Sequence, residues 1–456
     1  MNDVLTAFET ARRVRDGAVS AIAVVEQCLE SIAAANPSLN AFADVFAAHA
    51  LAAAARVDAM VAQGTNPGRL AGVPFAVKSL FDVEGHATVA GSAARSSRAA
   101  AKADAFLIRQ LRRHGSILVG TTHMDELACG ATGENPHFGP VKNPQDLKRM
   151  TGGSSSGSAA AVAGGLVPLA LGSDTNGSIR APAALCGTWG LKPTFGRLSR
   201  AGALPYADSL DCMGGFADNV RDLALLYDCL QGADAFDASQ ARNSVDFIES
   251  VAGGSNLRIG VLTGYFEQFS DENAWNGVEQ VIRAFSNCVA VPISVEEMQL
   301  VRSAAAIVSN VEVAGAHEEL LAKHGDECSP RLKTRLLAGA LTRAKWYLRA
   351  RQYQRVFRAR MEHLFDDYDI LVAPCTPFAA PGFDAAAIIV NGEPLEPAKH
   401  LGMLTQPISF AGLPVVTAPI FIGAGLPVGV QLIGARWRED RCFQAANQIE
   451  NAVAFD

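Results

Sequence analysis

Two segments rich in glycine and serine constrain this chain more than any other feature. Residues 152–158 read Gly-Gly-Ser-Ser-Ser-Gly-Ser, and residues 172–180 read Gly-Ser-Asp-Thr-Asn-Gly-Ser-Ile-Arg. Glycine permits the positive φ angles and close backbone approaches that a site made of main-chain N–H groups requires. Serine hydroxyls can attack a carbonyl group or relay a proton. The two segments therefore predict a reactive site that brings Ser154 and Ser178 together.

A lysine ends an apolar run upstream of these segments. The run Pro74-Phe75-Ala76-Val77-Lys78 predicts a buried strand whose last residue carries an amine. Burial favours the neutral form of an amine, which can then serve as a base for a serine at neutral pH. Taken alone, however, a lysine at the end of a strand more often reaches solvent.

A loop of this composition before an alanine-rich helix can also bind phosphate. The pattern G-x-x-x-x-G-K-[ST] does not occur in the chain, and Lys78 lies far upstream of the loop instead of at its end. Judged by its own residues, the loop can bind an anion or can be purely structural.

The composition predicts a soluble globular protein. Hydrophobic residues make up 49% of the chain and charged residues 19%, and the net charge is −7. These values argue against disorder and against nucleic-acid binding, because a phosphate backbone requires clustered lysine and arginine. Basic residues do gather between Arg331 and Arg360, but aromatic residues interleave with them as on an amphipathic helix. The nine cysteines show no C-x-x-C pair, so we expect free thiols, no metal site and a cytoplasmic location.

Membrane insertion is not expected. The uncharged stretch from 401 to 435 is long enough to span a bilayer, but four prolines interrupt it. Such punctuation favours short buried strands joined by turns, with the best candidates at 415–418 and 428–433.

The order of apolar and polar segments predicts a mixed α/β fold in one domain. Residues 1–64 are expected to be helical, with Ser20 as a possible N-cap. Residues 65–230 are expected to form the catalytic core, with strands at 73–77, 117–120 and 167–171. A polar connection at 231–257 then leads to a second α/β part, 258–456, that completes the sheet and the substrate pocket.

Several segments resemble the amidase signature family of Ser-cisSer-Lys hydrolases, and the resemblance covers nearly the whole chain. It rests on residues 70–78, the two glycine- and serine-rich segments, residues 186–194 and residues 425–434. The resemblance implies a mixed central β-sheet covered by helices on both faces, and no metal or organic cofactor. By position it implies Lys78 as the general base, Ser154 as a bridging serine in a cis peptide bond, and Ser178 as the acylated nucleophile. The implied oxyanion hole consists of main-chain N–H groups of Thr175, Asn176, Gly177 and Ser178.

Two branches of the family compete for the substrate. Residues 335–341 and 404–414 resemble the 1-carboxybiuret hydrolase branch of nitrogen catabolism. Such an enzyme cleaves a terminal amide of a small anionic ureido compound and releases ammonia and urea-1,3-dicarboxylate. Arg335 aligns with a carboxylate-binding arginine, Asn176 could contact a polar substrate, and Tyr206 and His317 are weaker candidates for the pocket wall.

The alternative branch is the large, glutamine-hydrolysing component of a tRNA-dependent amidotransferase. That branch has an acidic residue close to the place that Gly402 occupies here. A second alternative is an inactive homologue that acts as a scaffold. Members of both branches often bind a small helical subunit, so the resemblance implies a heteromer with a partner similar to the C component of the amidotransferase. The alanine-rich N-terminal helices also offer apolar faces for dimerisation of the large subunit.

Overall fold

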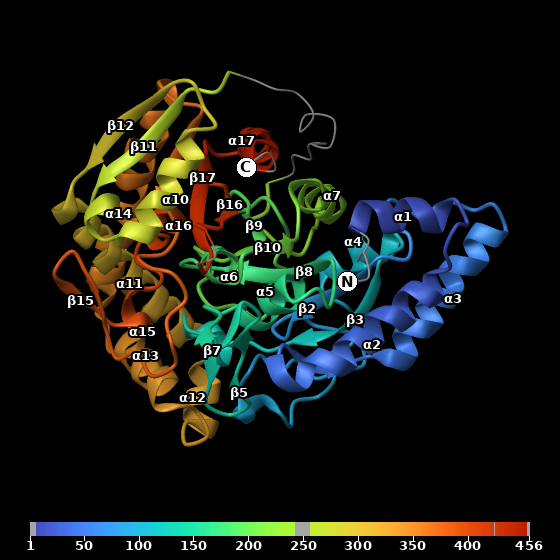
Figure 1. Cartoon of the computed structure of the whole chain (residues 1–456). Coiled ribbons are helices and arrows are strands. Elements are labelled where there is room, and N and C mark those ends of the chain that lie inside the picture. Colours follow the sequence, from blue (N-terminus) through green and yellow to red (C-terminus); the bar gives the residue numbers. More distant parts are fainter. Residues whose placement is uncertain (1–5, 242–255, 424, 454–456) are drawn as a thin grey trace.

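A computed structural model describes residues 6–241, 256–423 and 425–453 of the chain. One sheet of eleven strands runs through the middle of the molecule (Figure 1). In spatial order its strands are β1 (Phe42–Val45), β3 (Ile117–Thr122), β2 (Pro74–Lys78), β8 (Leu169–Asp174), β10 (Cys212–Ala217), β9 (Trp189–Lys192), β16 (Val415–Ile420), β17 (Val428–Gly434), β13 (Ile370–Pro374), β11 (Ile259–Gly264) and β12 (Cys288–Ile293).

The sheet is mixed, as the sequence predicts. Strand β2 is parallel to both of its neighbours, β3 and β8, and β11 is parallel to β12 and β13. The remaining pairs are antiparallel. Strand β9 pairs with β16, so strands from the 65–230 and 258–456 parts of the chain share one sheet.

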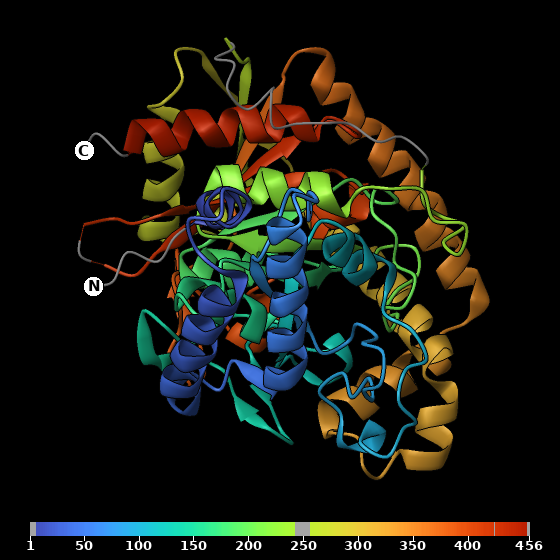
Figure 2. The same cartoon turned by 90° about the vertical axis from the view of Figure 1, so that its right-hand side faces the viewer.

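Helices cover both faces of the sheet. On one face lie α4 (Phe106–Arg113), α7 (Val220–Leu230) and α17 (Glu439–Val453), and Figure 2 shows α17 stacked above α7. On the other face lie α5 (Ser156–Ala163) and α6 (Arg180–Cys186). Apart from Val162, helix α5 consists of serine, glycine and alanine, which allow it to lie close to β8. A Cβ atom at Gly172 of β8 would come within 2.9 Å of the Oγ of Ser155, the residue just before the helix. This close packing brings the residues before α5 to the end of the strand.

The remaining helices lie toward the two ends of the sheet, and some of them also pack against its faces. Near β1 lie α1 (Ala7–Arg15), α2 (Ala21–Leu39) and α3 (Ala47–Ala62), drawn in blue in Figures 1 and 2. At the other end are α9 (Tyr265–Gln268), α10 (Glu272–Ile282), α11 (Val295–Ala316), α12 (Glu318–His324), α13 (Pro330–Ala340), α14 (Ala344–His363), α15 (Pro397–His400) and α16 (Gln406–Ala411). Two short elements bear on the site, β4 (Glu134–Asn135) and its partner β5 (Gly139–Pro140).

The N-terminal region differs in one respect from the prediction. Ser20 does cap α2, since its hydroxyl accepts a hydrogen bond from the N–H of Ala23. The region is not entirely helical, however, because β1 lies between α2 and α3 and pairs with β3 at the sheet edge. Part of the predicted connection at 231–257 lies outside the described residues. Within the described ranges, no helix combines the length and apolar character needed to cross a membrane.

A buried ion pair joins the start of α17 to the segment that follows β9 and predicts a large stability effect. Glu439 accepts a hydrogen bond from the N–H of Thr194 at 2.9 Å and pairs with Arg197 Nη2 at 3.0 Å, and both charged side chains are buried. We expect Glu439→Gln to lower the free energy of unfolding by about 3–5 kcal/mol, because Arg197 keeps a buried charge without its carboxylate. Urea unfolding measures this loss. The control Lys323→Gln, in an exposed pair with Glu319, should cost less than about 1 kcal/mol; equal losses would contradict the assignment.

Candidate active site

The site forms where two parallel strands end side by side. Lys78 is the last residue of β2, and Asp174 is the last residue of the adjacent β8. Because parallel strands end at the same edge of a sheet, the loops that follow them meet there. The glycine- and serine-rich loops also lead into helices: Ser154 stands two residues before α5, and Ser178 two residues before α6.

Three serine hydroxyls surround the amine of Lys78. Its Nζ lies 2.7 Å from Ser154 Oγ, 2.9 Å from Ser155 Oγ and 2.9 Å from Ser173 Oγ. Ser155 Oγ in turn donates to the carbonyl of Ser173 at 3.1 Å, so its proton is already committed and it must accept from the amine. A neutral amine has two N–H donors and one lone pair, a set that suits two accepting hydroxyls and one donating hydroxyl.

Burial shifts the amine toward that neutral form. Lys78 is fully buried, and this burial lowers its pKa to about 7. The carboxylates of Asp125, Asp174 and Asp211 act in the opposite direction and keep the pKa from falling further. Lys78 is therefore poised to exchange a proton near neutral pH.

Ser154 and Ser178 come together as the sequence predicts. The peptide bond between Gly153 and Ser154 is cis, and Ser154 is fully buried beside Lys78. The N–H of Ser155 donates to the carbonyl of Ser178 at 3.3 Å, which joins the two loops. Ser178 is only half-buried and lines a pocket. The arrangement thus places a buried lysine and serine behind a serine that a ligand can reach.

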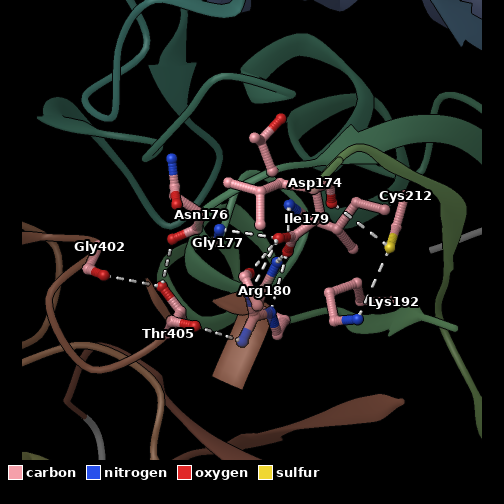
Figure 3. Close-up of polar contacts among 12 residues, drawn as sticks. Asp174, Asn176, Gly177, Ile179, Arg180, Lys192, Cys212, Gly402 and Thr405 are labelled. Atoms are coloured by element: carbon pink, nitrogen blue, oxygen red, sulfur yellow. Dashed lines mark hydrogen bonds and ion pairs between the residues drawn. The ribbon is translucent and has the colours of Figure 1, made fainter. Parts of the chain in front are cut away.

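A buried ion pair shapes the loop that carries Ser178. Asp174 and Arg180 are fully buried and share two hydrogen bonds of 2.9 Å, one from Nε and one from Nη2 (Figure 3). Burial alone would raise the pKa of Asp174, but Arg180 outweighs it and holds that pKa below its usual range. The same carboxylate accepts hydrogen bonds from the N–H groups of Gly177 and Ile179. These two charged residues therefore fix the loop and do not face the pocket.

One of the four predicted oxyanion donors already has a hydrogen-bond partner in the structure. The N–H of Gly177 donates to Asp174 at 2.8 Å and is thereby occupied. Within the part of the chain that the structure describes, no acceptor contacts the N–H groups of Thr175, Asn176 or Ser178. Three of the four predicted donors are thus unoccupied at the pocket, and Gly177 is the exception.

Thr405 also contacts the loop that carries Ser178. Its hydroxyl shares one proton between the carbonyl of Asn176 at 2.7 Å, the shorter contact, and that of Gly402 at 3.1 Å, and its carbonyl accepts from Arg180 (Figure 3). Gly177 has a φ of +128°, and a Cβ atom there would lie 2.1 Å from Thr405 Oγ1. Only glycine fits this position of the loop.

The pocket above Ser178 is small and basic. Its cavity measures about 100 Å³. Four of its lining residues are basic and come from three helices, namely Arg302 of α11, Arg331 and Arg335 of α13, and Lys399 of α15. Among the described lining residues there is no aspartate or glutamate. Such a pocket attracts a small anion.

The sequence predicted some of the residues that line the pocket at Ser178. Arg335 lines the pocket and donates to the hydroxyl of Tyr206 at 3.1 Å, so both candidates lie at the site. His317 does not line it, and its Nε2 lies 3.0 Å from the carbonyl of Pro205. The structure adds residues that no sequence pattern indicated: Ser155 and Ser173 beside the amine, Asp125 behind it, and Arg302, Arg331 and Lys399 in the wall. Only the crowding of serines in the two loops could have signalled the first two.

A buried lysine joined to a serine, with a second serine below unoccupied N–H donors, is an arrangement suited to acyl transfer at an amide. Comparison with known proteins agrees. The family described as Amidase matches residues 23–443. The chain is 43% identical to AtzE, a 1-carboxybiuret hydrolase subunit of Pseudomonas sp. (strain ADP), over 97% of each chain. It is 34% identical to the A component of the glutamyl-tRNA(Gln) amidotransferase of Chromohalobacter salexigens, over 98% of this chain and 96% of the relative.

Solved structures agree with these relatives. A structure of an s-triazine catabolic enzyme, described with a vestigial protein complex, superposes with a TM-score of 0.95 at 42% identity and covers 98% of each chain. An amidase structure reaches a TM-score of 0.89 at 30% identity, over 98% of this chain and 100% of the other. The chain belongs to the amidase signature family, whose members hydrolyse amide C–N bonds.

The fit of Gly177 against Thr405 predicts a sharp loss of activity on substitution. We expect Gly177→Ala to lower kcat for amide hydrolysis by about 10²–10³-fold, the size of effect seen when an oxyanion donor is lost, because the added methyl group displaces the loop. Gly165→Ala is a matched control, since Gly165 also has a positive φ, of +67°, but has nothing within 4 Å of its Cβ position. Equal kcat values for the two variants would show that the loop tolerates the displacement.

Proposed function

We propose that this protein hydrolyses the terminal amide of 1-carboxybiuret and releases ammonia and urea-1,3-dicarboxylate. The observation that carries the proposal is the basic pocket over Ser178, which suits a small planar anion. The similarity to the 1-carboxybiuret hydrolase AtzE over nearly the full length supports the same substrate.

The proposed chemistry begins with neutral Lys78. The three contacts of the amine allow its two N–H bonds to donate to Ser155 and Ser173, which leaves its lone pair to accept from the hydroxyl of Ser154. As Ser178 Oγ attacks the amide carbonyl, its proton passes to Ser154 Oγ and the proton of Ser154 passes to Lys78. Lys78 then returns a proton by way of Ser154 to the leaving nitrogen, and ammonia departs. Water attacks the acyl group on Ser178 through the same relay and regenerates the enzyme.

Main-chain donors stabilise the tetrahedral intermediate. The N–H groups of Thr175, Asn176 and Ser178 are the available donors, and Asp174 fixes the loop that presents them. Such a donor typically lowers the free-energy barrier by about 2.7–4 kcal/mol. The donors need not be reoriented during the reaction, because the buried ion pair of Asp174 and Arg180 already fixes the loop that carries them.

Arg335 reads the carboxylate in this proposal. Its guanidinium is held by the hydroxyl of Tyr206, and a planar guanidinium forms paired hydrogen bonds with a carboxylate. Arg331 stands one helical turn earlier on α13 and lines the same wall. Asn176 donates its side-chain amide to Ser309 at 3.2 Å, so it belongs to the wall and contributes its backbone N–H to the oxyanion.

Glutamine is the less suitable substrate. Its α-amino group is a cation and needs an acidic partner, whereas no described lining residue is acidic and Gly402 offers only its backbone. An inactive scaffold is the remaining alternative, and it predicts no acylation of Ser178.

We also propose a cytoplasmic heteromer with a small helical subunit. The large components of glutamyl-tRNA(Gln) amidotransferases are similar to this chain by both sequence and fold, and the s-triazine enzyme of similar structure is described with a protein complex. Dimerisation of the large subunit through its N-terminal helices belongs to the same proposal.

Ammonia release tests the function directly. The purified protein, with and without a co-expressed helical subunit, is given 1-carboxybiuret, biuret, oxamate or glutamine, with Ser178→Ala as the blank. We expect turnover of 1-carboxybiuret above the other three. Preference for glutamine, or release equal to the blank on all four, would contradict the proposal.

The pKa of Lys78 predicts the pH dependence of the reaction. The burial-lowered pKa of about 7 leaves the amine protonated below pH 7 and neutral above it. We therefore expect kcat/KM to rise with pH through a midpoint near 7 and to level off above it. Lys78→Met should remove the rise together with most of the activity, whereas a profile that is flat from pH 5 to 9 in the unaltered protein would argue against lysine as the base.

The carboxylate assignment predicts a selective binding defect. We expect Arg335→Met to raise KM for 1-carboxybiuret by about 10²-fold, equivalent to about 2.7 kcal/mol for a lost charge-assisted contact, with a smaller effect on uncharged biuret. Lys333→Met is the matched control, because Lys333 lies on the same helix but pairs with Asp326 and does not line the pocket. A rise in KM that is the same for both substrates would contradict the assignment.

A further inference from the structure

Asp125 is buried behind the site without a side-chain partner. The residue is 2% exposed, and both carboxylate oxygens are inaccessible to solvent. Among the residues that the structure describes, no side chain forms a hydrogen bond with either oxygen. Since a buried carboxylate normally has several partners, this isolation calls for a function.

The carboxylate lies against the backbone that carries Ser154. A Cβ atom would come within 2.4 Å of Asp125 Oδ2 at Gly153, and within 2.0 Å of it at Gly130. Both glycines line the pocket, so Asp125 is separated from a ligand only by backbone. The N–H of Asp125 also donates to the carbonyl of Ser154 at 3.3 Å. Asp125 thus contacts the Gly153–Ser154 segment through both its side chain and its main chain.

Asp125 differs from the two other carboxylates near Lys78. Asp174 is neutralised by Arg180 in a buried ion pair. Asp211 accepts hydrogen bonds from Thr175 Oγ1 at 2.5 Å and from the N–H groups of Tyr206 and Ala207 at 2.8 and 3.0 Å. Asp125 has no comparable compensation, so more of its charge remains to act on its surroundings.

The charges around Asp125 come from three other elements. Arg331 of α13, Lys78 of β2 and the N–H of Gly133 favour its ionised form, whereas Glu134 of β4 opposes it. Burial dominates and raises the pKa of Asp125 to about 6. Of the three carboxylates that act on Lys78, Asp125 has the largest electrostatic effect.

We propose that Asp125 is a positioning residue that supplies the counter-charge for the ammonium form of Lys78 and holds the Ser154 segment in place. The inference rests on the proposed function, because in that reaction neutral Lys78 becomes an ammonium when it takes up a proton through Ser154. Asp125 forms no bond and exchanges no proton in this step. Its uncompensated negative charge lowers the cost of creating a buried cation, and it does so without touching the amine.

The counter-charge sets the strength of the base. A buried lysine without a nearby anion loses its proton too readily and then accepts one poorly from a serine. With Asp125 ionised, its negative charge opposes the effect of burial and helps to keep the pKa of Lys78 near neutral pH. Removal of the negative charge must therefore lower the pKa of Lys78 and move the acid side of the rate profile to lower pH.

The test is the pH dependence of Ser178 acylation by p-nitrophenyl acetate in a single turnover, from pH 5 to 9. This reagent makes the measurement independent of the natural substrate. In Asp125→Asn we expect the acid midpoint to fall by about 1 pH unit relative to the unaltered protein, with a lower plateau rate. Asp125→Ser removes the same charge in a smaller side chain and should show the same shift if asparagine does not fit between the glycines.

Asp222→Asn is the matched control. Asp222 is also buried and accepts hydrogen bonds from the N–H groups of Ala7 and Phe8, but it is not among the charges that act on Lys78. It should leave the midpoint unchanged. An unshifted midpoint in both Asp125 variants overturns the inference, even if their rates fall at every pH. Failure of the unaltered protein to acylate would instead overturn the proposed function.

Discussion

The ion pair between Asp174 and Arg180 is the interaction on which the site depends. It joins the end of β8 to the start of α6, and Arg180 continues to the carbonyl of Thr405 and, at 2.8 Å, to the side chain of Gln431 on β17. Three segments distant in sequence, at residues 174–180, Thr405 and Gln431, are thereby fixed around one buried guanidinium. Breaking such a pair typically costs several kcal/mol, since the remaining charge has no solvent to receive it. This ion pair, together with the hydrogen bonds from Gly177 and Ile179 to Asp174, holds the loop of Ser178 in place.

The site separates two uses of buried charge. Asp174 is fully paired and shapes the backbone, whereas Lys78 is surrounded by hydroxyls and kept near its titration point. A direct carboxylate partner would hold Lys78 as a permanent ammonium and remove its value as a base. A carboxylate that does not contact the amine, such as Asp125, instead keeps the pKa of Lys78 near neutral pH. The basic pocket wall lines the same cavity as Ser178, whereas Lys78 is not among the residues that line it.

Sequence patterns predicted those features that depend on local structure. Apolar runs located the strands β2, β3, β8, β16 and β17. Motif resemblance indicated Lys78 and Ser154, whose side chains are in contact, and Ser178, whose carbonyl accepts from the N–H of Ser155. Strand β1 was missed because it is only four residues long and only its first residue is buried. The hydrogen bond that occupies the Gly177 N–H and the isolation of Asp125 were also missed, because both depend on contacts between segments that no local pattern encodes. Arg302 and Lys399 reach the pocket from helices that tertiary packing alone brings together.

Mass spectrometry of the acyl-enzyme tests the central claim most directly. The protein is mixed with 1-carboxybiuret, quenched with acid within the first turnovers, digested and analysed for a modified peptide. We expect a mass increase confined to the peptide that contains Ser178, with none when Ser178→Ala is treated in the same way. Ammonia release without any modified peptide, or a modification on Ser154 or Ser155 instead, would contradict acylation of Ser178.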